Sequence, residues 1–111
     1  MSMITLFRKN DPNEFNPNFF IPEELLKDSK YKKMSGNAKL AFILIYDRFK
    51  NSKLKDEMGN VYCEFTIREL MELLQRSKSA VIHIKKELIK YKLLEQKYVI
   101  EKASRLYVKG I

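Results

Sequence analysis

Residues 66–91 decide the fold of this chain and read TIRELMELLQRSKSAVIHIKKELIKY. Thr66 and Glu69 match a capping box, in which each side chain hydrogen-bonds the backbone amide of the other residue. A helix is therefore predicted to begin at this point. Its apolar residues recur at helical spacing and form one face: Ile67, Leu70, Met71 and Leu74.

A second cap residue, Ser77, is predicted to open another helix shortly after the first one ends. Its inward-facing residues are Val81, Ile84, Leu88 and Tyr91. Two helices joined by about three residues indicate a helix-turn-helix. Leu93 and Leu94 then lead into a polar stretch, and residues 106–108 are expected to form a returning strand. These two segments together would make a wing.

The segment before the motif supplies the rest of the predicted core. Residues 35–50 have a Ser/Gly/Asn start followed by apolar residues three and four apart, which predicts a central helix. Gly59 and Asn60 signal a turn, and residues 61–65 are predicted to be the first strand of a small sheet. The expected fold class is α+β and mainly helical, a winged helix-turn-helix with a small antiparallel sheet.

Charge is concentrated at the C-terminal end of the chain. Residues 75–111 hold ten Lys or Arg against three Glu, which is +7 of the chain's formal +8. The isoelectric point near 9.6 indicates a polyanionic partner, for which nucleic acid is the first expectation and an anionic membrane the second. We therefore expect residues 1–18 to be a flexible N-terminal arm and residues 19–111 to be a winged-helix DNA-binding domain.

The sequence also argues against several other classes of protein. The longest apolar run, residues 40–46, is far too short to span a bilayer, and charged residues interrupt any secretory signal near the N-terminus. A cytoplasmic location is expected. One histidine, His83, and one cysteine, Cys63, are too few for a zinc site or for a His-pair nickase. The three glycines are isolated, which argues against the phosphate-binding loop of a P-loop NTPase. We predict no enzymatic activity and no cofactor, with Cys63 as a small buried hydrophobe.

The outward face of the second helix holds most of the candidate DNA contacts. Ser77, Lys78 and Ser79 near its start have the reach to touch base edges, and Lys86 and Lys90 are placed for phosphates. Two further candidates on this helix are Ile82, expected to be exposed and able to meet a thymine methyl, and His83, a weaker candidate for a base or phosphate contact.

Other candidates flank that helix. Arg68 lies at the start of the first helix of the motif, where phosphates commonly bind, and Arg76 lies in the joint. The wing candidates are Lys97, Lys102, Ser104 and Arg105, of which Arg105 is the preferred residue for a narrow minor groove. Tyrosines in the predicted strands can stack on single-stranded bases, but core or interface positions suit them better.

The order and spacing of short motifs resemble the N-terminal domain of the RepA-type plasmid replication initiators of Gram-positive bacteria. The motifs are Phe20-Ile21-Pro22, Tyr31-Lys32-Lys33-Met34-Ser35, Ala38-Lys39-Leu40, Asp47-Arg48, Asp56-Glu57, Gly59-Asn60-Val61-Tyr62, Glu69-Leu70, Ser77-Lys78, Val81, Lys86-Glu87-Leu88 and Arg105-Leu106-Tyr107-Val108. The chain departs from the family pattern at Gln75-Arg76 and at Lys92, where glycines are usual, and in the wing tip, 99–103, which has no glycine.

The resemblance implies binding to double-stranded DNA at repeats, or iterons, in a plasmid origin, as a homodimer that initiates replication. Host replication proteins would be recruited through a further C-terminal domain, which follows this one in the family. From the residues alone, two alternatives stay open. One is a winged-helix transcriptional regulator, and the other is a non-catalytic protein-interaction module.

Overall fold

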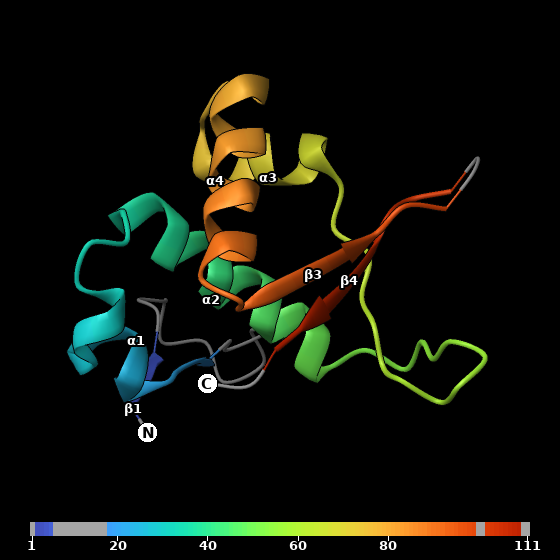
Figure 1. The fold of residues 1–111 in the computed structure, drawn as a ribbon, viewed down its shortest axis with the longest axis horizontal. Helices are drawn as coiled ribbons and strands as arrows, with labels where there is room; N and C mark the ends of the chain where they lie inside the picture. Colours follow the sequence, from blue (N-terminus) through green and yellow to red (C-terminus); the bar gives the residue numbers. More distant parts are fainter. Residues whose placement is uncertain (1, 6–17, 100–101, 110–111) are drawn as a thin grey trace, which may run out of the picture.

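A computed structural model describes residues 2–5, 18–99 and 102–109 of the chain. The elements in chain order are β1 (Ser2–Thr5), β2 (Asn18–Ile21), α1 (Glu23–Lys27), the 3-10 helix η1 (Ser29–Tyr31), α2 (Gly36–Lys50), α3 (Ile67–Leu74), α4 (Lys78–Lys90), β3 (Leu94–Lys97) and β4 (Arg105–Val108). Helices α2, α3 and α4 pack together, and the β3–β4 hairpin projects from the base of α4 (Figure 1).

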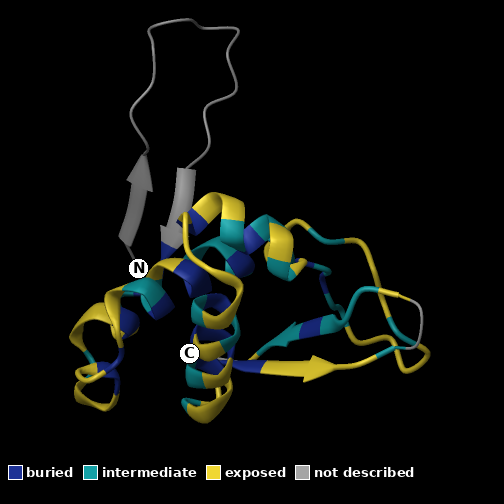
Figure 2. Ribbon diagram, turned by 90° about the horizontal axis from the view of Figure 1, so that it is seen from above, coloured by how far each residue is buried: buried dark blue, intermediate teal, exposed yellow. Residues whose placement is uncertain are grey.

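Helix α2 is the centre of the core, as its apolar spacing predicts. The Ser35 hydroxyl caps its start and accepts a hydrogen bond from the Ala38 amide at 3.1 Å. Its buried residues are Ala38, Ala41, Phe42 and Ile45. The helix contacts β2, α3, α4 and β4, so buried residues gather on the inner sides of the helices (Figure 2).

The helix-turn-helix forms where the sequence predicts it. The Glu69 amide donates to the Thr66 hydroxyl at 3.0 Å, and the Thr66 amide donates to the Glu69 carboxylate at 3.1 Å, so the capping box is complete. Helix α3 ends at Gln75, and Ser77 caps α4 by accepting from the Ala80 amide at 3.2 Å.

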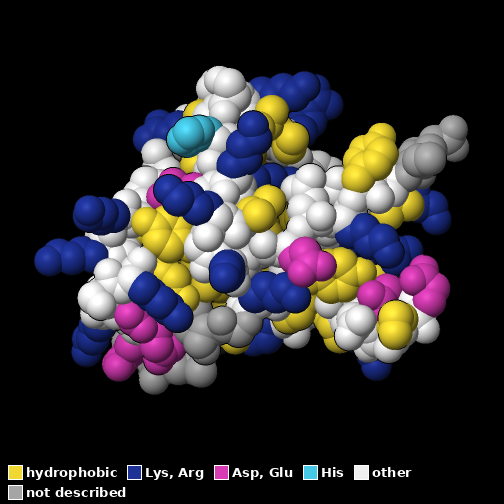
Figure 3. Space-filling model, viewed as in Figure 1, with side chains coloured by type: hydrophobic (Ala, Val, Ile, Leu, Met, Phe, Trp, Pro, Cys, Tyr) yellow, Lys and Arg dark blue, Asp and Glu magenta, His cyan; other side chains and the backbone are white. Residues whose placement is uncertain are grey.

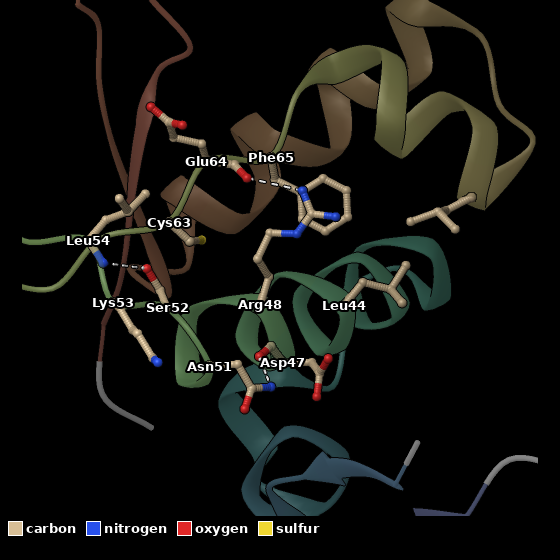
Figure 4. Close-up of a pocket in the computed structure, with 11 residues that line it drawn as sticks. Leu44, Asp47, Arg48, Asn51, Ser52, Lys53, Leu54, Cys63, Glu64 and Phe65 are labelled. Carbon is tan, nitrogen blue, oxygen red and sulfur yellow. Dashed lines mark hydrogen bonds between the residues drawn. The ribbon is translucent and has the colours of Figure 1, made fainter. Parts of the chain in front are cut away.

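Arg48 of α2 connects the central helix to the start of the motif. Its guanidinium donates to the Glu69 carboxylate at 2.8 Å and to the Glu64 carbonyl at 3.1 Å. The same group lies 3.7 Å from the centre of the Phe65 ring, and the close-up shows it beside that ring (Figure 4). One side chain thus fixes both the entry to α3 and the end of the preceding extended segment.

The wing is a two-stranded antiparallel sheet. Leu94 lies opposite Val108 and Lys97 lies opposite Arg105. Leu93, Leu94 and Leu106 are buried and anchor the base of the hairpin in the core. The predicted winged helix-turn-helix is therefore confirmed.

The predicted strand at residues 61–65 is wrong in its extent. Only Cys63 pairs with β4, through two hydrogen bonds to Leu106 of 3.0 and 2.8 Å. The Tyr62 amide donates instead to the Leu54 carbonyl, and the Tyr62 carbonyl accepts from the Ser52 hydroxyl at 2.6 Å. Because its backbone groups bond loop atoms and Arg48, the segment is extended but does not become a third strand.

The N-terminal segment also differs from the expected flexible arm. Residues 2–5 form β1, which pairs antiparallel with β2 from Ser2 opposite Ile21 to Thr5 opposite Asn18. A short strand is held by backbone hydrogen bonds, so the scattered apolar residues of this segment gave no sign of it. Residues 6–17 of the predicted arm lie outside the described part of the chain. The division at residue 18 stays a prediction.

Lys85 on α4 is buried, with 7% of its surface exposed, although the sequence gave no sign of it. It lies between Val81 and Leu88 on the inward face, and burial lowers the pKa of its ammonium group. Among residues 18–99 and 102–109, no carboxylate forms an ion pair with it. Removal of this charged ammonium group from water therefore destabilises the folded state.

Replacing the capping threonine should destabilise the domain measurably. Thr66→Ala removes the acceptor of the Glu69 amide, and loss of an N-cap side chain costs about 1 kcal/mol. Urea denaturation would show this as a lower midpoint with an unchanged slope. Ser29→Ala is the matched control, because it shortens an exposed hydroxyl side chain and should change stability by less than about 0.5 kcal/mol. Equal effects of the two substitutions would contradict the capping box.

Lys85→Met should stabilise the domain by about 1 kcal/mol at neutral pH, since it fills the same space without a desolvated charge. A lysine with a lowered pKa destabilises the fold while it is charged, and this destabilisation decreases as pH rises above the folded pKa and is gone above the ordinary lysine pKa. The stability difference between Lys85→Met and wild type should therefore narrow at alkaline pH. Thermal melts from neutral to alkaline pH would measure it, and a destabilised variant would contradict the assignment.

Candidate nucleic-acid interface

One face of α4 is open to solvent along its length. Ser79, His83, Lys86 and Lys90 are exposed and lie opposite the buried Val81, Ile84 and Leu88. Their spacing of three and four residues places them on one side of the helix. Lysine and arginine side chains surround the histidine on this face of the molecule (Figure 3). The structure thus brings together four of the predicted contacts.

The start of α4 is also exposed and carries Lys78 next to the cap. The Ser77 hydroxyl oxygen accepts the Ala80 amide and lies 3.4 Å from the Ser79 hydroxyl. Ser77 is therefore first a helix cap, and its hydroxyl proton and second lone pair remain for Ser79 or another partner. The N-terminal end of a helix also favours negative charge, which suits a phosphate nearby.

The Ile82 side chain is less exposed to solvent than its predicted contact with a thymine methyl group requires. It is partly buried, whereas the sequence predicts an exposed side chain. Ile82 lies three residues before the buried Lys85, so it borders the inward face of α4. A thymine methyl could meet only its outer edge.

The two arginines of the motif lie near opposite ends of α3. Arg68 is exposed in the first turn of the helix, and Arg76 is exposed in the joint just before α4. An Arg76 nitrogen lies 3.5 Å from the Gln75 carbonyl oxygen, which is a weak contact. Within the described parts of the chain, neither guanidinium forms an ion pair. Both are available to an anion.

The predicted wing residues divide into two groups. Lys97 and Lys102 are exposed near the end of the hairpin, and Ser104 is half-buried. Arg105 has only 18% of its side chain exposed, pairs with the Glu57 carboxylate at 3.4 Å and lies 4.7 Å over the Tyr62 ring. A DNA contact by Arg105 would require it to leave both partners, so that contact stays a prediction.

Arg105 belongs to a set of contacts that the sequence did not indicate. The Tyr107 hydroxyl donates to the Asp56 carboxylate at 2.9 Å, and the Tyr107 ring lies 5.9 Å from the Tyr62 ring. The pKa of Asp56 is lowered chiefly by its hydrogen bond from the Asn60 amide, with help from Tyr107. These contacts fasten the loop after α2 to β4. They position the wing and leave its lysines outward.

Metal-ligating side chains do not cluster in the described part of the chain. No group of three His, Cys, Asp or Glu side chains that could hold a metal ion occurs among them. A hollow of about 530 Å³ is lined by Arg48, Asp47, Asn51 and Cys63 among others (Figure 4). Burial raises the pKa of the Cys63 thiol to about 11, so it is no nucleophile at neutral pH. No helix in these parts of the chain is long and apolar enough to cross a membrane.

The sequence of this fold matches a known protein family. The family described as "Replication initiator protein A (RepA) N-terminus" matches residues 18–111. The chain belongs to this RepA N-terminal family. The match covers every element from β2 to β4, and it confirms the resemblance found in the short motifs.

Individual proteins and solved structures are also similar to this chain. A "41 kDa protein" from Lactobacillus helveticus is 35% identical over 97 residues, which are 83% of this chain and 28% of that protein. The chain therefore spans less than a third of this relative's length. Solved structures of an "N-Terminal domain of DNA binding protein" and of a "Rep-DNA complex" each have a TM-score of 0.70 and 30% identity, and each match covers 88% of this chain and 76% of the other. An "MDR initiator" structure has a TM-score of 0.68 and 28% identity, covering 88% of this chain and 78% of the other.

Two of the three expected departures from the family pattern coincide with backbone strain, and the third, the wing tip at 99–103, lies partly outside the described residues. Gln75 has a φ of 52° and Lys92 has a φ of 62°, so both adopt the left-handed conformation that favours glycine. Each follows the last residues of a helix, where such a conformation lets the chain turn away. The chain therefore makes both turns without glycine, and each left-handed residue with a Cβ atom destabilises the fold by about 1 kcal/mol relative to glycine.

Lys92→Gly should raise the free energy of unfolding by up to about 1 kcal/mol, because glycine adopts the left-handed conformation without a clashing Cβ atom. Differential scanning calorimetry at several scan rates would measure the gain. Lys92→Ala is the matched control, since it removes the same charge and keeps the Cβ atom. An equal gain from both substitutions would mean that charge, and not backbone strain, is responsible.

Proposed function

We propose that this chain binds double-stranded DNA by sequence, at repeats in a plasmid origin, and so initiates plasmid replication. The observation that carries the proposal is the exposed basic face of α4 in a helix-turn-helix. Lys78, Lys86 and Lys90 have no ion-pair partner among the described residues. A protein similar over 88% of this chain has been solved as a Rep-DNA complex, which supports the same role here.

The dimensions of α4 suit the major groove. Its 13 residues give a rod about 20 Å long, and a helix with its side chains is about as wide as the groove, roughly 12 Å. In this position Lys78 and Ser79 point toward base edges, where a lysine favours guanine acceptors. Lys86 and Lys90 lie further along and meet phosphates, which position the protein without reading sequence.

The remaining candidates border this groove. Arg76 binds a phosphate near the start of α4 and Arg68 binds one near the start of α3, while Lys97 and Lys102 bring the wing to the neighbouring backbone. His83 lies between the two groups on α4 and donates to a base or phosphate. Ser104 and Arg105 support the wing first and touch DNA only if the hairpin rearranges.

The wider role belongs to the same proposal. Origin repeats suit a homodimer, and host replication proteins would be recruited by a further domain of a longer initiator. The protein acts on plasmid DNA in the cytoplasm and performs no catalysis itself.

Fluorescence anisotropy would test the proposal directly. A duplex carrying the repeats from the plasmid's own initiator gene is compared with a scrambled duplex at two salt concentrations. We expect about a thousandfold preference for the repeats, which is within the usual range of specific binding. Equal and steeply salt-dependent binding to both duplexes would contradict sequence recognition and favour a protein-interaction module. Loss of plasmid maintenance when the repeats are deleted would separate an initiator from a transcriptional regulator.

Substitutions on α4 should separate base contacts from phosphate contacts. Lys78→Ala and Ser79→Ala should remove roughly 1–3 kcal/mol of discrimination between repeat and scrambled duplexes. Lys86→Ala and Lys90→Ala should weaken binding to both duplexes alike and reduce the slope of log affinity against log salt by about one each. Lys55→Ala, which removes an exposed lysine from the loop after α2, serves as the control. Equal losses on both duplexes for all four variants would contradict this orientation of α4.

A further inference from the structure

Positive charge continues past α4 on the side away from the wing. Lys30, Lys32 and Lys33 are exposed where η1 leads into α2, and we call them the flank patch. Lys30 lies 5.0 Å over the Tyr31 ring, and none of the three lysines forms an ion pair within the described residues. By contrast, Lys27 pairs with Glu23 at 3.9 Å. The flank patch is therefore charge that the protein itself leaves uncompensated.

Two contacts fix the flank patch beside α4. The Ser35 amide and hydroxyl both donate to the Glu87 carboxylate, at 2.7 and 2.9 Å. The Tyr31 ring, which is buried, lies 6.1 Å from the Tyr91 ring at the end of α4. Because the segment is held at both points, the three lysines keep a defined position relative to the proposed recognition helix.

A hollow lies between the start of α2 and the exposed face of α4. Its polar lining residues are Ser35, Asn37, Arg76, Ser79, His83 and Glu87. The Glu87 carboxylate keeps its negative charge in this hollow, and its two oxygens accept from the Ser35 amide and hydroxyl, so a phosphate is expected at the basic rim and not beside Glu87. Basic side chains continue from α4 across this side of the molecule (Figure 3). The surface beside the helix can therefore receive an anionic backbone.

The size of the groove determines what lies next to the helix. A helix with its side chains is about 10–12 Å wide and fills a major groove of roughly 12 Å, so protein on either side of it faces the two strands that border the groove. The wing lies on one side of α4 and the η1–α2 segment lies on the other (Figure 1). We propose that the flank patch binds phosphates of the strand opposite the one that the wing approaches. This inference rests on the proposed function.

The test is the double variant Lys32→Ala/Lys33→Ala, measured by anisotropy on the repeat and scrambled duplexes over a range of salt. Its affinity should fall by about tenfold on both duplexes, and the salt slope should decrease by about two, one for each lost phosphate contact. Lys53→Ala/Lys55→Ala removes the same charge from the loop after α2 and should keep the wild-type slope. Lys32→Arg/Lys33→Arg keeps the charge and should bind like wild type.

The outcomes separate this inference from the function on which it rests. Wild-type preference for the repeats, together with equal slopes for the two alanine pairs, would overturn the flank patch and leave the proposed function intact. Absence of any preference in the wild type would instead overturn the proposed function, and the inference with it. The side chains of Lys32 and Lys33 are exposed and form no ion pair within the described residues. The double variant should therefore have the melting temperature of the wild type, and the two affinities can be compared directly.

Discussion

The Glu69 carboxylate holds the helix-turn-helix in place because it bonds two elements at once. One oxygen accepts the Thr66 amide at 3.1 Å and starts α3, while the other accepts the Arg48 guanidinium of α2 at 2.8 Å. The Thr66 amide and then Arg48 lower the pKa of Glu69. Its contribution is therefore present above the ordinary glutamate pKa and is lost as pH falls through the lowered value. This carboxylate therefore links the start of α3 to α2, and α4 packs against both helices.

Acidic side chains elsewhere in the domain have similar internal uses. Glu87 bonds Ser35 and fixes α4 to the start of α2, while Asp56 and Glu57 bond residues of β4 and steady the wing. Because these carboxylates bond residues within the domain, the lysines on the outward faces of α4 and the wing are not neutralised by them. Lys78, Lys86 and Lys90 on α4 form no ion pair within the described residues, so their charge is open to a polyanion.

Local patterns predicted the elements well, because a helix start or an amphipathic face depends on residues within one or two turns. The capping box at Thr66, the cap at Ser77 and the inward face of α2 are all of this kind. The burial of Lys85, the partners of Arg105 and the failed strand at 61–65 depend instead on contacts between distant segments, such as Arg105 with Glu57, 48 residues apart. Periodicity carries no information about such pairs. The exposed position of the candidate contacts on α4 could be predicted from the sequence. The pairing of Arg105 with Glu57 and Tyr62, which keeps it within the wing, could not.

The central claim is that the exposed face of α4 meets duplex DNA while α2 and α3 hold it. Backbone amide chemical shifts of the wild-type chain, followed as the repeat duplex is added, test it most directly. The account predicts the largest changes in residues 77–90, with further changes in the wing and at the start of α2. Little change should occur around the exposed apolar Leu54 and Leu73. Changes centred on those two leucines, with the amides of α4 unaltered, would contradict it.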